Sequence, residues 1–363
     1  MMSRFTYNQL RAMLLTMALG VLMIACSSDD AGSNSPVVQP EIPRDGTDLS
    51  VSTRSVAVDD SYIIPEGAKL WLALTSGTDV ASNGTYVYNS SSTWTPYPAA
   101  KVWEAQQYFL YGALLQSDNA KCSITTPGDF AYSATLNIEG VEPVVASGAD
   151  PLVIVGVQGF ETSPTEWDVK EGSFGYMGKK VEGQDNVHLL LDHLYTALTF
   201  SFSIDPEYAI LRTIKLKTVE MISNSAKKLN LSVALAGNNQ EVTPITSITS
   251  TESSDDAAGN PVVLFSSDDG VDISQPWPDG APAISSGCFI PSVASSLSVV
   301  CTYDVYDKAS TLLATRKAVN SLSAITPATR GQVKSINLKV IPTYLYILSD
   351  NDLDNPTIKI NSN

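Results

Sequence analysis

The chain has 363 residues, of which 44% are hydrophobic and only 17% charged, so it is not disordered overall and has room for about two domains. Its 38 acidic and 22 basic residues give a net charge of −16, which argues against nucleic acid as a partner. The sequence contains only two histidines, His188 and His193. Histidine-based nucleophilic catalysis and histidine-rich metal sites are therefore disfavoured.

The first 26 residues have the pattern of an export signal. Two arginines precede an uncharged apolar run over residues 12–25. This run is shorter than the about 20 residues that a helix needs to span a bilayer, so it predicts a signal peptide. It ends in Ala25-Cys26, which resembles the lipobox of bacterial lipoproteins, with Met23 where leucine is usual. The resemblance implies lipidation of Cys26; the other interpretation is an ordinary signal peptide with a chance cysteine.

Residues 27–50 are polar, contain scattered prolines and show no apolar periodicity, which predicts a flexible tether. Their first four residues, Ser-Ser-Asp-Asp, resemble the signal that sends some Gram-negative outer membrane lipoproteins to the cell surface. Near the end of the tether, Leu49 and Val51 alternate with serines just before Arg54. This alternation predicts a short strand ahead of the globular part.

Apolar and polar residues alternate in most segments beyond residue 55, which predicts β-strands. Clear cases are residues 68–74, 198–204, 214–217, 229–235, 299–305 and 335–340. Residues 152–157 are continuously apolar and suit a strand that is covered on both faces. The expected fold class is all-β, with two antiparallel β-sandwiches in tandem.

Three further expectations concern the connections. The apolar positions of residues 187–194 have helical spacing and favour a short helix before the strand at Ala197. Long polar loops are expected at 238–260 and 266–287. A Gly/Lys-rich stretch ends before Asn186, where we place the boundary between the two sandwiches.

The sequence indicates no enzyme, cofactor or metal site. His188 and His193 fall on opposite faces of a strand, so a shared metal is disfavoured. Residues 350–354 resemble the first half of a calcium loop, but Asn355 and Asn361 replace the glycine and glutamate that such a loop needs. A solvated turn is therefore favoured over a calcium site.

Two sets of side chains leave alternatives open. Cys288 and Cys301 can form a disulfide in an oxidising compartment, or Cys301 can be a buried thiol on the apolar face of its strand. The tryptophans can line a sugar-binding platform, although packing in the core or rim of a sandwich is the more common role. They are Trp71, Trp94, Trp103, Trp167 and Trp277.

Several short motifs, in this order, resemble those of the fimbrillin family, the type V pilins. They are the lipobox, the Thr53-Arg54 pair, a His-x-x-x-Ala strand from His193 to Ala197, and a final segment over residues 330–348. In that family the fold consists of transthyretin-like sandwiches. The resemblance implies export as a lipoprotein, cleavage by an arginine-specific protease, and loss of an amino-terminal strand. The opened groove then accepts the carboxy-terminal tail of another pilin subunit.

Carried onto this chain, the resemblance implies that Leu49 and Val51 belong to the removable strand and that cleavage follows Arg54. Arg44 is the alternative, but a cut there leaves Leu49 and Val51 attached. The chain then divides into a signal peptide, a lipidated prosegment, two sandwiches and an appended donor strand. Their ranges are 1–25, 26–54, 55–186, 187–342 and 343–363.

The tail also stands out by its own pattern. Pro342 interrupts the last strand, and two short alternating segments follow it. Their apolar residues are the candidate donor positions: Tyr344, Leu345, Tyr346, Ile347, Leu348, Ile358 and Ile360. An apolar chain end needs cover, and strand donation to another subunit supplies it. We expect the tail to close no sheet of its own domain; the alternative is that it folds back.

The favoured function is a shaft or tip subunit of an adhesive pilus, located in the fimbrium after maturation. One alternative is an anchor subunit that keeps its lipid in the outer membrane. Another is a surface lipoprotein that binds glycans, which requires neither Arg54 nor an apolar tail. In each case a host or bacterial surface ligand is an expected partner.

Overall fold

The computed structural model describes residues 46–55, 64–91, 93–115, 120–126, 133–146, 150–160, 169–178, 185–223, 228–237, 244–253, 261–274, 283–292, 297–322, 329–341 and 357–361. Over these residues the fold is all-β, as the sequence predicts, with one short helix, α2 (Pro206–Leu211). No helix within these ranges is long and apolar enough to cross a membrane.

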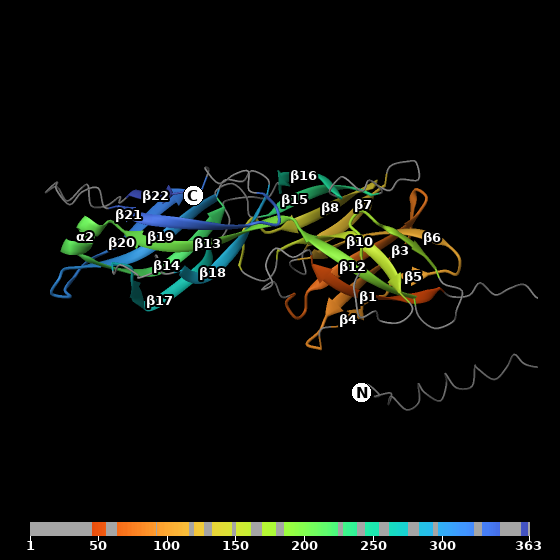
Figure 1. Ribbon diagram of the computed structural model, residues 1–363, viewed down its shortest axis with the longest axis horizontal. Coiled ribbons are helices and arrows are strands. Elements are labelled where there is room, and N and C mark those ends of the chain that lie inside the picture. The colour runs from red at the N-terminus through yellow and green to blue at the C-terminus, as the bar shows by residue number, and fades with distance from the viewer. Residues whose placement is uncertain are drawn as a thin grey trace, which may run out of the picture. The chain divides into compact units, whose positions relative to one another are not determined.

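The amino-terminal half is built on two sheets (Figure 1). The larger has the order β4 (Trp94–Pro96), β3 (Asp79–Tyr88), β2 (Lys69–Ser76), β6 (Gln107–Leu115), β10 (Leu152–Phe160), β12 (Asp185–His193), β1 (Thr47–Ser55), β5 (Lys101–Val102), with β11 (Gly175–Met177) beside β6. The smaller has the order β16 (Ile245–Glu252), β15 (Leu229–Ala236), β8 (Ser133–Val141), β7 (Lys121–Thr125).

Two further sheets form the carboxy-terminal half. The first has the order β22 (Thr357–Asn361), β21 (Val333–Ile341), β13 (Tyr195–Ile204), β18 (Ala283–Pro291), β9 (Val145–Ala146). The second has the order β17 (Val262–Asp272), β14 (Thr213–Ser223), β19 (Leu297–Tyr306), β20 (Leu312–Ser321). The described strand pairs are antiparallel except β1 with β12 and β13 with β21, which are parallel.

The larger amino-terminal sheet is buried on both faces. One face, including Tyr111 and Val153, packs against Leu136 and Val233 of the smaller sheet. The other face forms a second core, which includes Leu49, Tyr86 and Val187. The sheet curls so that β3 meets β1 across this core, which we call the curled core. Residues 152–157 are accordingly all buried, which confirms the prediction of a strand covered on both sides. A third core lies between the two carboxy-terminal sheets.

The expected helix over residues 187–194 is wrong, because residues 185–193 form β12. Both faces of this strand are covered: Val187 and Leu189 enter the curled core, while His188 on the opposite face is also buried. A strand covered on both faces loses its alternation, and its apolar run then matches helical spacing by coincidence.

The two long loops are also wrong in part, because β16 lies inside residues 238–260, and β17 and β18 occupy much of residues 266–287. β16 and β17 are edge strands with exposed faces, so they carry polar residues. Their Thr, Ile and Val content is the strand signal that the polarity obscured.

Asn186, the predicted domain boundary, lies inside β12, and β8 pairs with β15 from beyond that point. The division at residue 186 stays a prediction. α2 was not predicted, although its start has a recognisable signal. Asp205 caps the helix by accepting a 3.0 Å hydrogen bond from the Glu207 backbone N–H, and Pro206 takes the first helical position.

Candidate functional site

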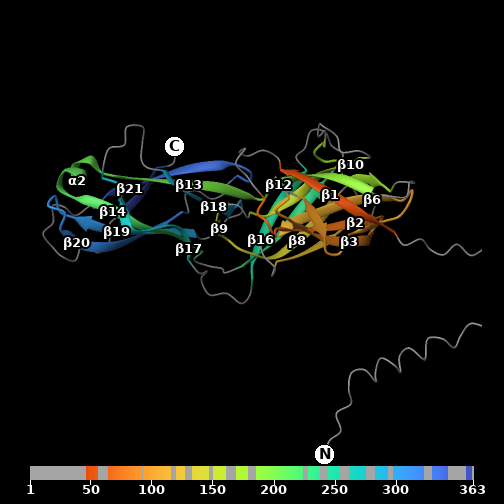
Figure 2. The same cartoon turned by 90° about the horizontal axis from the view of Figure 1, so that it is seen from below.

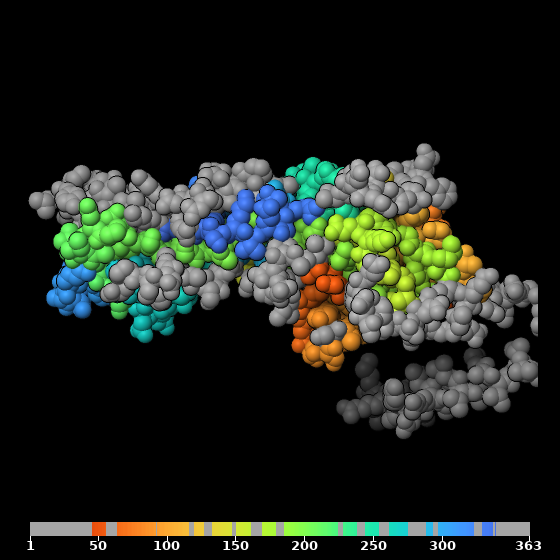
Figure 3. All heavy atoms as spheres, viewed as in Figure 1, coloured from red at the N-terminus to blue at the C-terminus, as the bar shows by residue number. Residues whose placement is uncertain are grey.

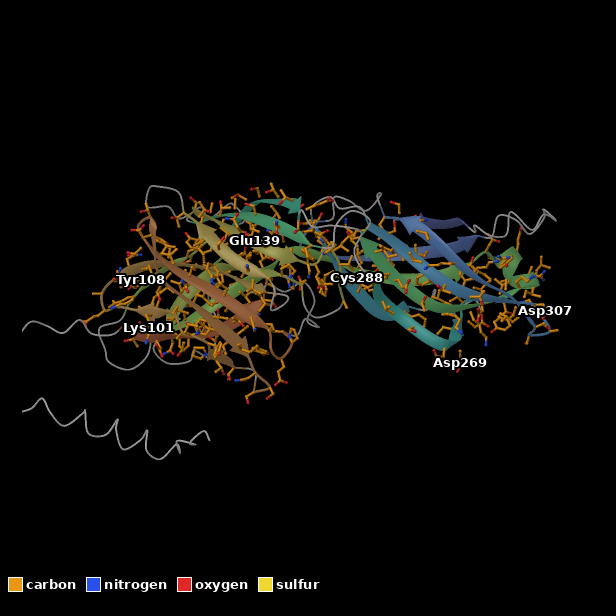
Figure 4. The ribbon with its side chains drawn as sticks, turned by 180° about the vertical axis from the view of Figure 1, so that it is seen from behind. Lys101, Tyr108, Glu139, Asp269, Cys288 and Asp307 are labelled. Carbon is orange, nitrogen blue, oxygen red and sulfur yellow. The ribbon has the colours of Figure 1, made fainter. Side chains whose placement is uncertain are left out.

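β1 is an internal strand of the larger sheet. From Leu49 to Ser55 it pairs in parallel with β12, and at its start Thr47 and Asp48 pair with β5 in antiparallel register. Figure 2 shows β1 beside β12 from a second side. Asp48 also forms an ion pair with Lys101 of β5, whose position is labelled in Figure 4. The segment before Arg54 is thus part of the folded sheet, and the flexible tether predicted over residues 27–50 is wrong for residues 47–50, because they belong to β1.

The inner face of β1 enters the curled core. Leu49 is only 1% exposed, and Val51 packs against the same core. The Leu49 backbone N–H donates to Ala100 O at 2.9 Å, and Tyr86 Oη donates to Leu49 O at 2.8 Å. The Ala100 N–H donates in turn to Tyr86 Oη at 3.1 Å. Burial raises the pKa of Tyr86, so its neutral hydroxyl can both accept and donate in this bridge.

The outer face of β1 carries Ser50, Ser52 and Arg54. Ser52 Oγ is hydrogen-bonded to Nδ1 of His188 on β12. The His188 ring stacks on Phe160 of β10, with centroids 3.9 Å apart and an interplanar angle of 9°. Burial lowers the pKa of His188, which favours the neutral ring in this position.

The bond after Arg54 lies inside the strand ladder. Arg54 is opposite Leu190 and Ser55 is opposite Leu191 in the pairing with β12. The Arg54 side chain is exposed, and atoms of the red-orange β1 segment reach the surface in Figure 3. One residue earlier, Thr53 Oγ1 accepts a 3.0 Å hydrogen bond from Trp94 Nε1. The proposed cleavage point therefore combines an accessible arginine with a paired backbone.

The other end of the chain holds the second candidate element. In β22, Ile358 is opposite Val340 and Ile360 is opposite Leu338 of β21. The expectation that the tail closes no sheet of its own domain is therefore wrong for residues 357–361, because these residues form an edge strand on the last domain strand.

Several predicted residues lie outside the described ranges. They are Cys26, Arg44, Tyr344, Leu345, Tyr346, Ile347, Leu348 and the acidic run at 350–354. The lipidation of Cys26 and the first donor segment remain predictions.

The two motif segments of the second half are neighbours. β13 pairs in parallel with β21, which places Ala197 opposite Val333. His193 Nδ1 lies 2.7 Å from Asp150 Oδ2 in a buried pair, and Arg330 forms an ion pair with Asp192. These residues hold the chain where it passes from β12 into β13. The motif thus has a role in the fold.

The side chains with open alternatives are placed as follows. The described cysteines, Cys122, Cys288 and Cys301, are free, so Cys288 and Cys301 form no disulfide. Burial raises the pKa of Cys288 (Figure 4) and of Cys301 to about 12. Within the described ranges no group of three or more His, Cys, Asp or Glu side chains is placed to hold a metal ion.

Trp71 and Trp94 are partly buried against the cores, and Trp103 is 38% exposed. Trp167 and Trp277 lie outside the described residues. Trp94, Tyr86 and His188, which contact β1, were not recognised from the sequence as its partners. They lie 37 to 136 residues from their contacts in β1, and no local pattern announces such pairs.

No protein-family model matches the chain, and no curated protein matches it. Solved structures do resemble it. A fimbrial protein from Bacteroides vulgatus has a TM-score of 0.42 and 11% identity, over 87% of this chain and 98% of that one. A protein from Parabacteroides distasonis proposed to act in cell adhesion has a TM-score of 0.40 and 10% identity, over 87% and 96%.

The fimbrial anchor protein Mfa2 from Porphyromonas gingivalis has a TM-score of 0.34 and 10% identity, over 87% of this chain and 97% of that one. The structural neighbours thus include fimbrial proteins, the class that the sequence resembles.

Proposed function

We propose that the chain is a structural pilus subunit, exported as a lipoprotein through Cys26 and matured by cleavage after Arg54. Loss of the segment up to Arg54 removes β1 from its sheet. The carboxy-terminal tail of another subunit then takes its place, and the resulting polymer serves adhesion at the cell surface.

The observation that carries this proposal is the position of β1. It is seated between β12 and β5, places Leu49 in the core, and carries the exposed Arg54 as its second-last residue. A segment that only tethers a domain has no reason to occupy an internal strand position. A prosegment that occupies a strand position until an arginine-specific protease releases it does have such a reason.

Removal of β1 leaves unpaired strand edges and an empty position in the core, and a donor strand can fill both. The edges of β12 and β5 lose their partners, and unpaired edges accept an extended segment by main-chain hydrogen bonding. The Leu49 slot also opens, and refilling it with one large apolar side chain contributes about 1.5–3 kcal/mol. A donor must therefore be extended and apolar at alternating positions.

The tail has these properties. The Ile358-Lys359-Ile360 sequence of β22 alternates, and β22 pairs only with β21 within the described chain. Leaving that edge breaks one ladder, and entering the vacated slot forms ladders with β12 and β5. The exchange thus replaces one neighbouring strand by two, which is the gain that favours donation once the slot is open.

Limited trypsin treatment of the purified full chain tests the proposal. We expect cleavage after Arg54 to produce fibres visible by electron microscopy. Arg54→Gln should stay monomeric, whereas the matched variant Arg44→Gln should assemble normally. The reverse pattern would assign maturation to Arg44. Assembly of both variants without loss of β1 would contradict the proposal and favour a subunit that retains its prosegment, as an anchor does.

A further inference from the structure

The peptide bond that we propose as the cleavage point is not in a loop. Arg54 and Ser55, the residues on its two sides, are both paired with β12. A protease binds its substrate as an extended strand by main-chain hydrogen bonds, and it cannot do so while the backbone is committed to another ladder. Cleavage after Arg54 therefore requires this end of β1 to leave the sheet first.

Two side-chain contacts hold that end, one on each face of the strand. On the inner face, the Trp94 indole N–H donates to Thr53 Oγ1 at 3.0 Å. On the outer face, Ser52 Oγ bonds to His188, whose ring is fixed by stacking on Phe160. Both contacts involve the two residues immediately before Arg54.

The partners of these contacts are themselves held. Trp94 lies on β4, packs against the curled core, and its ring lies 5.0 Å from that of Tyr88. His188 is 2% exposed on the internal strand β12. Trp94 and His188 are therefore already in place when β1 docks, so forming these two hydrogen bonds costs little side-chain entropy on the β4 and β12 side of each contact.

We propose that Trp94–Thr53 and His188–Ser52 form a latch that sets the rate of maturation by controlling how often the Arg54–Ser55 bond leaves the sheet. The latch delays cleavage and thereby keeps the subunit from opening its groove too early. This inference rests on the proposed function, because it assumes that Arg54 is the maturation point. Trp94 and His188 act as positioning residues for the strand that the protease cuts.

The rate of proteolysis of a folded protein follows the population of the locally open state when reclosing is fast. Loss of one hydrogen bond of the latch should therefore raise the cleavage rate by roughly two- to tenfold. Trp94→Phe is the cleanest variant, because it removes the indole donor and leaves the sequence around Arg54 unchanged. Trp71→Phe is the matched control, since Trp71 is also partly buried in this sheet but packs against the other core.

The test follows the appearance of the amino terminus at Ser55 by mass spectrometry while trypsin acts on the full chain. We expect Trp94→Phe to release it faster than both the natural chain and Trp71→Phe, at trypsin levels where the rate is proportional to enzyme. Equal rates in Trp94→Phe and Trp71→Phe would overturn the latch, including the case in which both rise through general destabilisation.

A double-mutant cycle distinguishes the latch from a loosened core. Thr53→Val removes the acceptor, and its rate is normalised to a peptide of residues 49–59 carrying the same change. If Trp94 acts through Thr53, the double variant should be cleaved no faster than either single variant, whereas multiplying effects would overturn the contact. Failure of any form to yield Ser55 as a new amino terminus would overturn the proposed function itself.

Discussion

The two terminal strands of the described chain, β1 and β22, differ in how they are held. β1 has a strand on each side, and Leu49 is buried and bridged through Tyr86. β22 has one partner strand and lies at the edge of its sheet. A strand fixed on both sides leaves when its covalent link is cut and a competitor arrives, whereas an edge strand can leave by losing one ladder. The same chain therefore carries one strand suited to retention and one suited to donation.

Loss of the tail should affect assembly most strongly. Removal of residues 343–363 should abolish fibre formation after cleavage at Arg54, because no donor remains. The uncleaved chain should still fold, with a smaller loss of stability than Leu49→Ala causes, since β22 pairs on one side only. Electron microscopy and calorimetry measure the two effects. Normal fibres from the truncated chain would contradict the donor role.

A substitution within the tail also tests its role as a donor strand. Ile358→Asp places a charge in an apolar slot and should block assembly. Thr357→Asp adds the same charge at the neighbouring position, on the opposite face of an extended strand, and should be tolerated. Equal loss of assembly in both variants would indicate that added charge alone, and not the Ile358 position, is responsible.

Leu49→Ala tests how strongly the burial of Leu49 stabilises β1 in its sheet. Leu49 is fully enclosed by the curled core, so the truncation should lower the free energy of unfolding of the uncleaved chain by about 2–5 kcal/mol. Ser50, the neighbouring exposed residue, offers a control, because Ser50→Ala should change the free energy of unfolding by less than about 0.5 kcal/mol. Chemical denaturation measures both. A small effect at Leu49 would show that β1 contributes little to its sheet.

The Tyr86 hydroxyl, which links Leu49 O to the Ala100 N–H, also stabilises the uncleaved chain. Tyr86→Phe leaves Leu49 O without this donor and the Ala100 N–H without this acceptor, and should cost about 1–3 kcal/mol of stability. Tyr97 is 79% exposed, so Tyr97→Phe should be close to neutral in the same denaturation experiment. Indistinguishable denaturation midpoints for the two variants would show that the Tyr86 hydroxyl contributes little to stability.

The rate of cleavage after Arg54 should also depend weakly on pH. The pKa of His188 is lowered by burial, so the open state binds a proton more readily than the closed one, and β1 is held best above the ordinary histidine pKa of about 6.5. The hold should weaken as the pH falls from that value toward the lowered pKa. Of the described residues next to His188, Arg54 is the charged group on the same face of β1, while Phe160 and Gln158 of β10 are neutral.

The measurement is the rate of cleavage after Arg54 between pH 7.5 and 5, divided at each pH by that of a free peptide with the same sequence. The ratio should rise toward acid in the natural chain. It should stay flat in His188→Asn, whose amide can bond Ser52 but does not titrate in this range. A parallel rise in both would assign the effect to other groups.

Local pattern predicted much of this fold from the sequence. The alternation of Leu49 and Val51 marks the real inward face of β1, and the continuous run at 152–157 marks a strand covered twice. The same reasoning failed at residues 187–194, where burial of both faces removes the alternation, and at β16, where edge exposure replaces apolar residues with polar ones.

The contacts of the candidate site were beyond the reach of sequence reasoning. Alternation shows which face of a strand is buried but not which strand lies beside it, so neither the parallel pairing of β1 with β12 nor the Trp94–Thr53 bond follows from local pattern. The tail shows the same limit: its alternation is compatible with strand donation and with pairing to β21, and the fold was needed to show the pairing.

The amino terminus of the subunit within assembled fibres, determined by mass spectrometry or sequencing, shows whether maturation removes β1. If β1 is the strand that maturation removes, the fibre subunit begins at Ser55 and residues 27–54 are absent. Fibres whose subunits retain Leu49 and Val51 would contradict the account, because the slot that the donor tail is proposed to enter would still be filled.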